Sequence, residues 1–458
     1  MIENDAFKLL LINLFHLNPD DITNIVCTTF NKMMVLLVTL ADKHQACPYC
    51  GFTAPKIKEY VTKEITHSAL TTQKCIIKYR ARRYKCPCCG KTYYEFNPFV
   101  FKSQKISILT VHNILKDLKD FNETFTSVAR RYHVSPTSVS TIFDNHVDIG
   151  RNPLPEIINF DEVYAFKSEK SKYVCVLLDF KKQIPVDVLP NRKKEFLLNY
   201  FQKIPLEERK KVKYACSDMY EVYRDVVHKV FPNCIFLLDY FHLSQDFHKK
   251  MNEVRIKVMK GYKDNKASDE YYLLKKFNWL LFKNPEDEDK HGRLFDVERE
   301  RKYNSHFKSY MNYYDLRKKL LEINNNLTIC YSLKLELVDF YSKSTIDNAK
   351  VNLEILIRSF IDTNIEEMIK FSNNLINWKQ EIINSFTIVG AEYKVEADKG
   401  QVVVCNKKVN NAIIENRNKI IKCIKNNANG YTNWLRFRNR VMYVLDPNAT
   451  FSLEPKEK

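Results

Sequence analysis

The alternation of apolar and polar residues predicts a series of short strands in the middle of the chain. Three apolar segments follow one another from residue 156, namely EIINFDEVYAF, KYVCVLLDF and QIPVDVLP. The helical pattern of EFLLNYFQKI then leads to a fourth strand in VKYACSDMY, and the helix EVYRDVVHKVF leads to a fifth in CIFLLDYFHL. The predicted order is therefore three strands in series, then helix, strand, helix and strand.

This order is the one expected of a ribonuclease-H-like α/β domain. In such a sheet the first and fourth strands are neighbours, so we expect Asp161 in the first strand to meet Asp218 at the end of the fourth. Paired carboxylates on adjacent strands suit Mg²⁺ or Mn²⁺, because these cations take oxygen ligands. A turn role at a strand end is the alternative for any single aspartate, and we predict it for Asp179 and Asp187.

The fifth predicted strand closes with Asp239 and His242, three positions apart. Their carboxylate and imidazole either support the predicted metal site or a bound phosphate, or they serve only the fold. The sequence leaves both roles open, so the two residues are treated as accessory to the aspartate pair.

A late helix carries a single acidic residue, Glu415, in the stretch VNNAIIENRNKIIK. At helical spacing five polar residues share one face, namely Asn411, Glu415, Asn418, Lys419 and Lys422, and the isoleucines expected to pack inward are Ile413, Ile420 and Ile424. Glu415 is therefore a candidate third metal ligand, with Asn418, Lys419 and Lys422 beside it as candidate contacts for a DNA backbone. The alternative is a surface ion pair between Glu415 and Lys419, four residues apart.

Two CPxCG motifs give a specific zinc signal near the N-terminus. The four candidate ligands are Cys47, Cys50, Cys86 and Cys89, and a glycine follows each pair. The run KCIIKYRARRY before the second motif predicts a strand that returns the chain to the first motif. Coincidental buried thiols are the alternative, and Cys88 leaves the register of the second pair open.

The stretch TFTSVARRYHVSPTSVSTIF, residues 124–143, has helix-turn-helix spacing. Ser135 followed by Pro136 is typical of an N-cap and first helical residue. The candidate DNA contacts are Thr137, Ser138 and Ser140 for a groove, and Arg130 and Arg131 for the backbone. An ordinary helical hairpin is the alternative.

Composition adds a partner class and a compartment. The chain has 458 residues, 45% of them hydrophobic, which is enough for more than one core. Lys+Arg 73 minus Asp+Glu 55 gives a net charge of +18, which favours nucleic acid as a partner, although an A+T-rich genome also enriches lysine. Thirteen cysteines and an acidic N-terminus in place of a secretion signal indicate a cytoplasmic protein. The apolar run at residues 33–41 is too short for a membrane span.

These patterns together predict a multidomain α/β protein. The expected segments are an N-terminal part with a four-cysteine zinc ribbon (1–100), a helix-turn-helix domain (101–150), the first part of a ribonuclease-H-like core (151–250), an all-helical insertion (251–400), and the final core helix with a tail (401–458).

The motifs follow one another in a specific order over nearly the whole chain. Two CPxCG motifs and the helix-turn-helix pattern precede the segments FDEVYAFK, SDMYEVYRDVV, FPNCIFLLDYFH and NNAIIENRNKIIKCIKNNANGYTNWLRFRNR. This order resembles that of bacterial insertion-sequence transposases of the ISL-three family. The resemblance implies that the catalytic DDE triad falls on Asp161, Asp218 and Glu415.

The resemblance also implies a reaction and its partners. The expected protein is a DNA transposase that uses Mg²⁺ or Mn²⁺, binds the inverted-repeat ends of its element, and cleaves and transfers strands into target DNA. Cutting two ends together implies a homodimer or larger assembly on DNA, associated with the bacterial nucleoid, with no membrane partner. A transposase-derived repressor without catalytic activity and a structure-selective nuclease are the alternatives.

Overall fold

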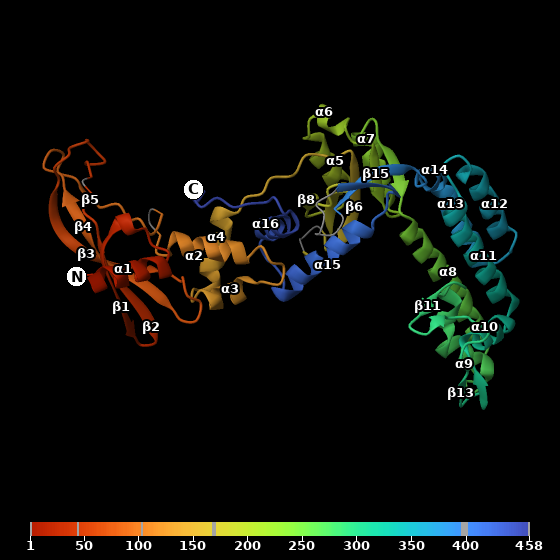
Figure 1. Ribbon diagram of the computed structural model, residues 1–458. Helices are drawn as coiled ribbons and strands as arrows, with labels where there is room; N and C mark the ends of the chain where they lie inside the picture. Colours follow the sequence, from red (N-terminus) through yellow and green to blue (C-terminus); the bar gives the residue numbers. More distant parts are fainter. Residues whose placement is uncertain (1, 44, 102–103, 167–170, 395–401, 457–458) are drawn as a thin grey trace.

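The chain folds as an elongated mixed α/β protein. The computed structural model describes residues 2–43, 45–101, 104–166, 171–394 and 402–456. Four regions follow one another along the long axis: an N-terminal sheet, a small helical group, a central sheet, and a helical arm at the far end (Figure 1). Within the described residues, no helix is both long enough and apolar enough to cross a lipid bilayer.

The N-terminal sheet packs one helix against five strands. Its elements are α1 (Ile2–Leu14), the 3-10 helix η1 (Pro19–Asp21), β1 (Ile22–Phe30), β2 (Met33–Leu40), β3 (Lys56–Thr66), β4 (Cys75–Lys85) and β5 (Thr92–Tyr94). The strand order is β1-β2-β4-β3, with β5 paired to β4. The strand predicted from KCIIKYRARRY is therefore confirmed as β4, and it leads directly into the second cysteine motif.

The small helical group consists of α2 (Ile108–Asp117), α3 (Phe125–Arg131) and α4 (Pro136–His146). The helix start predicted at Ser135 is confirmed, because its side chain accepts a hydrogen bond from the backbone N–H of Ser138 at 3.0 Å. His133 takes a positive φ of 54° in the turn between α3 and α4. The two helices share a buried core that includes Val128, Val139 and Phe143.

The central sheet has the predicted order of elements. These are β6 (Ile157–Val163), β7 (Val174–Asp179), β8 (Pro185–Leu189), α5 (Lys194–Gln202), the short α6 (Leu206–Arg209), β9 (Tyr214–Ser217), α7 (Glu221–Val230) and β10 (Ile235–Leu238). The spatial order is β10-β9-β6-β7-β8, in which β6 is antiparallel to β7 and parallel to β9. The predicted contact between the first and fourth strands is confirmed, since Ile158 lies opposite Ala215.

Of the two aspartates predicted to serve turns, one does so. Asp179 ends β7 and accepts hydrogen bonds from the backbone N–H groups of Lys181 and Lys182. Asp187 is instead buried within β8, where it accepts a hydrogen bond from Arg438 Nε at 2.7 Å. The turn prediction for Asp187 was wrong because its partner lies 251 residues away in sequence.

The helical arm follows the last strand of the central sheet. Its elements are α8 (Tyr240–Lys260), α9 (Asp269–Lys276), η2 (Asn278–Phe282), the hairpins β11 (Glu288–Asp289) with β12 (Gly292–Arg293) and β13 (Lys302–Asn304) with β14 (Ser309–Met311), α10 (Tyr313–Glu322), α11 (Asn325–Lys343), α12 (Ala349–Ile361), α13 (Glu366–Asn377) and α14 (Lys379–Asn384). A third hairpin, β15 (Ile388–Lys394) with β16 (Val402–Lys408), leads back to the sheet.

Two expectations for this region need correction. The segment is not all-helical, because three hairpins interrupt or follow its helices. Asp239 and His242 do not close a strand, since β10 ends at Leu238 and Asp239 is the N-cap residue of α8. The boundary expected at residue 400 lies outside the described residues. The arm and the central sheet share one hydrophobic core, which joins Phe247 and Phe360 to Phe160 and Phe201.

The chain ends with two helices that return to the central sheet, α15 (Ala412–Asn427) and α16 (Trp434–Leu445). Helix α15 packs on β6, and α16 packs on β8. The other side of α16 faces the small helical group. Tyr443 donates a hydrogen bond to the carbonyl of Leu115 at 3.0 Å, and Arg436 pairs with Asp144 of α4 at 2.6 Å.

Arg440 of α16 is the largest fully buried side chain, only 1% exposed. Its Nη2 donates to the backbone carbonyls of Asp120 and Glu123, both at 2.8 Å, in the loop between α2 and α3. Helix α16 therefore fixes the small helical group to the central sheet through buried polar bonds as well as apolar contacts.

Replacing Arg440 by methionine should loosen this connection. The two carbonyls would lose the donor that they share in a partly buried loop, at an expected cost of about 1–3 kcal/mol. Arg436→Met is the matched control, because its partly exposed ion pair should contribute less than about 1 kcal/mol. Thermal unfolding and hydrogen exchange of residues 108–147 measure the difference. Equal effects of the two substitutions would contradict the assignment.

Candidate functional site

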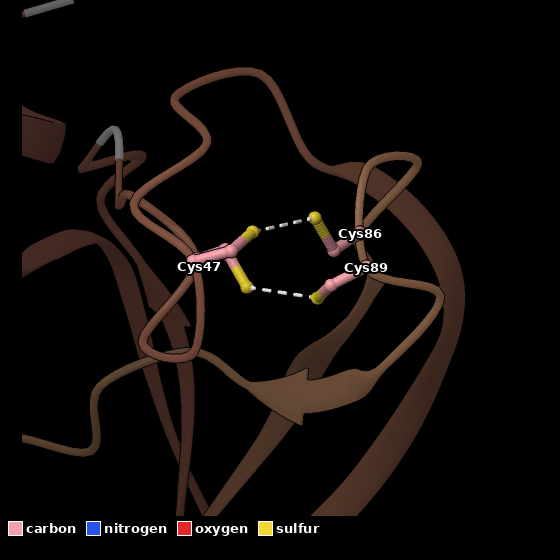
Figure 2. A group of neighbouring side chains, drawn as sticks. Cys47, Cys86 and Cys89 are labelled. Carbon is pink, nitrogen blue, oxygen red and sulfur yellow. Dashed lines mark hydrogen bonds between the residues drawn. The ribbon is translucent and has the colours of Figure 1, made fainter.

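The four cysteines of the CPxCG motifs converge on one point. Sγ of Cys47 lies 3.7 Å from Sγ of Cys89, and Sγ of Cys50 lies 3.5 Å from Sγ of Cys86. Figure 2 shows these sulfurs pointing toward one another from two facing turns. Each turn is completed by a glycine with positive φ, and Cys88 is exposed and outside the group.

This arrangement fits zinc. Four thiolates around one zinc ion, with Zn–S bonds of about 2.3 Å, lie about 3.8 Å apart in a tetrahedron. The observed separations are close to that value, and all four ligand atoms lie within 4.8 Å of one another. In the second motif the group of sulfurs includes Cys86 and Cys89, and Cys88 lies outside it.

A second group of chemically active side chains lies where β6, β9 and β10 end. Asp161 comes from β6, Asp218 directly follows β9, and Asp239 directly follows β10. Burial raises the pKa of Asp161 to about 7, and the charge of Asp218 adds to this shift. Burial also raises the pKa of Asp218 and of Asp239. Three carboxyl groups with raised pKa values at one sheet edge form a site that a cation would stabilise.

Asparagine side chains attach α15 to this edge. Asn418 Nδ2 donates to Asp161 Oδ2 at 2.7 Å, and Asn411 Nδ2 donates to the carbonyl of Phe160 at 3.1 Å. Asn159 Nδ2 in turn donates to Asn411 Oδ1 at 2.7 Å. Asn411 and Asn418 lie seven residues apart, which places them on one face of the helix.

The predicted faces of α15 were therefore partly wrong. Asn411 and Asn418 are buried, whereas Lys419 and Lys422 are exposed as expected. The buried isoleucines are Ile414, Ile421 and Ile424, with Ile413 and Ile420 only half-buried. The difference arises because the Nδ2 groups of Asn411 and Asn418 donate to acceptors on β6, which offsets part of the cost of burying these side chains.

Glu415, one turn after Asn411, reaches two residues that open α8. His242 Nε2 lies 3.7 Å from Glu415 Oε1 and 3.9 Å from Asp239 Oδ2. The backbone N–H of Asn411 donates to Asp239 Oδ1 at 3.2 Å. In the described chain, two groups bring three or more possible metal ligands within 4.8 Å: the four cysteines, and Asp239 with His242 and Glu415.

Of the three predicted acids, Glu415 alone belongs to a group of described residues whose ligand atoms lie within 4.8 Å of one another. Asp161 and Asp218 lie near enough to His242 for a charge on its imidazole to offset part of the rise in their pKa values, as it does for Asp239. An open cleft of about 390 Å³ runs along this edge, lined by Asp218, Met219, His242, Gln245, Asp246 and Lys249. Among the acids at this sheet edge, Asp218 borders the cleft, together with His242.

Sequence reasoning missed Asn159, Glu162 and the inward role of Asn411. Glu162 is an ion-pair partner of Arg192 and accepts a hydrogen bond from Tyr223 at 3.2 Å. A signal for Asn159 existed, because residues two apart in a strand share a face, and Asn159 precedes Asp161 by two.

The predicted contacts of α3 and α4 have different surroundings. Arg130 and Thr137 are exposed. Arg131 forms ion pairs with Asp117 and Glu123 within the helical group. Two hydroxyls are used locally: Ser138 Oγ lies 2.8 Å from Ser135 Oγ, and Ser140 Oγ donates to the carbonyl of Thr137 at 3.0 Å.

Comparison with known proteins identifies the family. A family model described as a transposase, of the DDE type and the ISL-three group, matches residues 158–397, more than half of the chain. The chain belongs to this transposase family. The resemblance drawn from the motifs is confirmed, and the matched region begins in β6 and ends before Glu415.

One curated relative shows how far the similarity extends. The transposase for insertion sequence element IS1001 from Bordetella parapertussis is 19% identical over 250 residues. The match covers 54% of this chain and 61% of the relative, so less than two thirds of that transposase is represented.

The cysteine cluster predicts about one zinc ion per chain in protein purified without chelators. Cys86→Ser should remove the metal and unfold the turns around it, because thiolate ligation supplies folding free energy. Cys88→Ser is the matched control and should keep the zinc. Elemental analysis of the three proteins tests this, and less than about half a zinc per wild-type chain would contradict it.

Proposed function

We propose that the chain is a DNA transposase that binds the ends of an insertion sequence and cleaves and joins DNA strands with a divalent metal. The observation that carries the proposal is the placement of three acids near His242: Asp161 on β6, Asp218 directly after the neighbouring β9, and Glu415 on α15, in a chain of the DDE transposase family. The sheet order β10-β9-β6-β7-β8 agrees with the ribonuclease-H-like core expected from the sequence.

In this proposal Asp161, Asp218 and Glu415 hold Mg²⁺ or Mn²⁺. When bound there, the ion would supply Lewis-acid chemistry for activating a hydroxyl nucleophile and stabilising a leaving oxygen. The protein fixes the orientation of Asp161 through two hydrogen bonds, from Asn418 to Oδ2 and from the backbone N–H of Glu162 to Oδ1, both at 2.7 Å. Its carboxylate is thereby presented in one orientation without further ordering.

DNA recognition is assigned to the first 150 residues. Helices α3 and α4 act as a helix-turn-helix, with exposed Thr137 and Arg130 as contacts and Ser138 and Ser140 supporting the start of α4. Arg131, already paired with two acids, orders the helical group. Zinc would hold the two cysteine turns together at the far end of the N-terminal sheet.

The other predicted segments complete this arrangement. The ribonuclease-H-like core comprises residues 151–250 and 401–458, and the arm between them carries both helices and hairpins. Lys419 and Lys422 are exposed on α15 and are proposed DNA-backbone contacts, whereas Asn418 positions Asp161. A reaction on two element ends requires two copies of the triad, so we propose a homodimer or larger assembly on DNA.

Neutralising any one acid of the triad should stop the chemistry and spare DNA binding. Asp161→Asn, Asp218→Asn and Glu415→Gln are each expected to lower metal-dependent nicking of end DNA by about 10²-fold or more. Asp225→Asn is the control, because this exposed aspartate pairs with Lys194 on α5, away from the triad. Nicking assays beside gel shifts at matched salt give the comparison.

The outcomes separate the proposed function from its alternatives. A repressor would bind end DNA without nicking, and a nuclease would nick without joining pre-cleaved ends to target DNA. Normal nicking by Glu415→Gln would remove Glu415 from the triad.

The role of α4 predicts a loss of sequence preference rather than of total binding. Thr137→Ala should lower the preference for end DNA over random DNA by about fivefold or more, since a base contact contributes about 1–3 kcal/mol. Ser140→Ala removes a hydroxyl that bonds to the protein's own backbone, so it should change the preference less. Binding curves at several salt concentrations on both DNAs provide the test. An equal loss on both DNAs would mean that α4 does not contact the bases.

A further inference from the structure

We infer that Asp239, His242 and Glu415 form a mixed carboxylate and imidazole site that binds a divalent transition-metal ion such as Mn²⁺ in preference to Mg²⁺. The inference rests on the proposed function, because Glu415 is shared with the triad. The inferred site contains Asp239 and His242, which are not members of the triad. The imidazole nitrogen of His242 gives the site a metal preference that three carboxylates alone would not give.

Two of the three separations are compatible with ligands that share one ion, and all three ligand atoms lie within 4.8 Å of one another. His242 Nε2 is 3.7 Å from Glu415 Oε1 and 3.9 Å from Asp239 Oδ2, both too long for hydrogen bonds. Two donors bound to one ion through bonds of about 2.1 Å lie at most about 4.2 Å apart. Both distances fall within this limit.

Two of the three groups present buried atoms without a partner. Asp239 Oδ2 and His242 Nε2 are inaccessible to solvent and accept or donate no hydrogen bond among the described residues. Asp239 is only 2% exposed, so solvent water cannot replace the hydrogen-bond donor that its Oδ2 lacks. A buried carboxylate oxygen with no donor is costly, and a bound cation removes that cost.

The backbone holds these groups in place before any ion binds. Asp239 is fixed by the backbone N–H of Asn411 on its Oδ1, which leaves Oδ2 directed at His242. His242 follows on the first turn of α8, and Glu415 lies one turn into α15. Since Asn411 also bonds to β6, the same residue sets the positions of both helices.

The donor set determines the metal preference. Mg²⁺ takes oxygen ligands and keeps several waters, so an imidazole is a poor ligand for it. Imidazole suits transition metals, and Mn²⁺ also accepts carboxylates readily. A site with two carboxylates and one imidazole therefore favours Mn²⁺ over Mg²⁺.

The test uses the full-length, zinc-loaded protein without DNA and Mn²⁺ as the probe. Binding is measured by electron paramagnetic resonance, and pulsed measurements detect the magnetic coupling of an imidazole nitrogen to bound Mn²⁺. Wild type should bind Mn²⁺ with this coupling and resist tenfold excess Mg²⁺. His242→Gln should lose the coupling and at least about tenfold in Mn²⁺ affinity, and Asp239→Asn should weaken Mn²⁺ binding as well.

Two controls separate this site from the rest of the molecule. His306→Gln changes a histidine that pairs with Asp269 in the arm, at 2.8 Å, and should leave the spectrum unchanged. Asp161→Asn should keep the nitrogen coupling, because Asp161 is not a ligand of this site.

Each remaining outcome overturns the inference. Bound Mn²⁺ without nitrogen coupling, no Mn²⁺ binding at millimolar concentration, or equal affinities for Mn²⁺ and Mg²⁺ would show that His242 serves only as a charged neighbour of the acids. Such a result combined with normal metal-dependent nicking by wild type would leave the proposed function intact. A wild-type protein that binds Mn²⁺ with the nitrogen coupling but does not nick end DNA would count against the proposed function and leave this inference intact.

Discussion

The hydrogen bonds between helix α15 and strand β6 are the constraint on which the candidate active site depends. Asn159, Asn411 and Asn418 form a buried polar seam that joins residues more than 250 positions apart. The side chain of Asn411 both accepts from Asn159 and donates to the carbonyl of Phe160, so one uncharged amide connects the helix start to the strand twice. The seam brings Glu415 to the ends of the strands and at the same time orients Asp161. Without it α15 would rely on its isoleucines and on the bonds of Asn411 N–H to Asp239 and of Arg417 to the carbonyl of Gln183.

The acids at this edge are an unfavourable arrangement that the rest of the fold sustains. Burial and mutual repulsion raise the pKa of Asp161, of Asp218 and of Asp239, so their ionised forms are disfavoured in the absence of a cation. Burial of the large core shared by the sheet and the arm offsets the unfavourable free energy of this group of acids. The arm therefore helps to position the carboxylates, because its first helix, α8, begins directly after its N-cap residue Asp239.

Helix α16 gives the molecule its second long-range connection. It packs on β8 with one side, while Arg440 and Tyr443 bond to the small helical group with the other. This connection joins the small helical group, in which we propose the DNA contacts, to the sheet that carries the carboxyl groups. One nitrogen of the buried guanidinium, Nη2, donates to two carbonyls of the same loop.

The sequence by itself determined the features that depend on neighbours in the chain. The cysteine turns, the start of α4 at Ser135 and the order of the five central strands follow from local spacing, and the strand adjacency follows from a general rule of topology. Only the tertiary structure decided which polar residues are buried. Asp187 accepts a hydrogen bond from Arg438, Asn418 donates one to Asp161, and Glu415 lies beside His242. Each pair joins residues that are far apart in sequence. Helical periodicity treats an asparagine as a surface residue, because the free energy of burying its amide depends on a partner that periodicity does not contain.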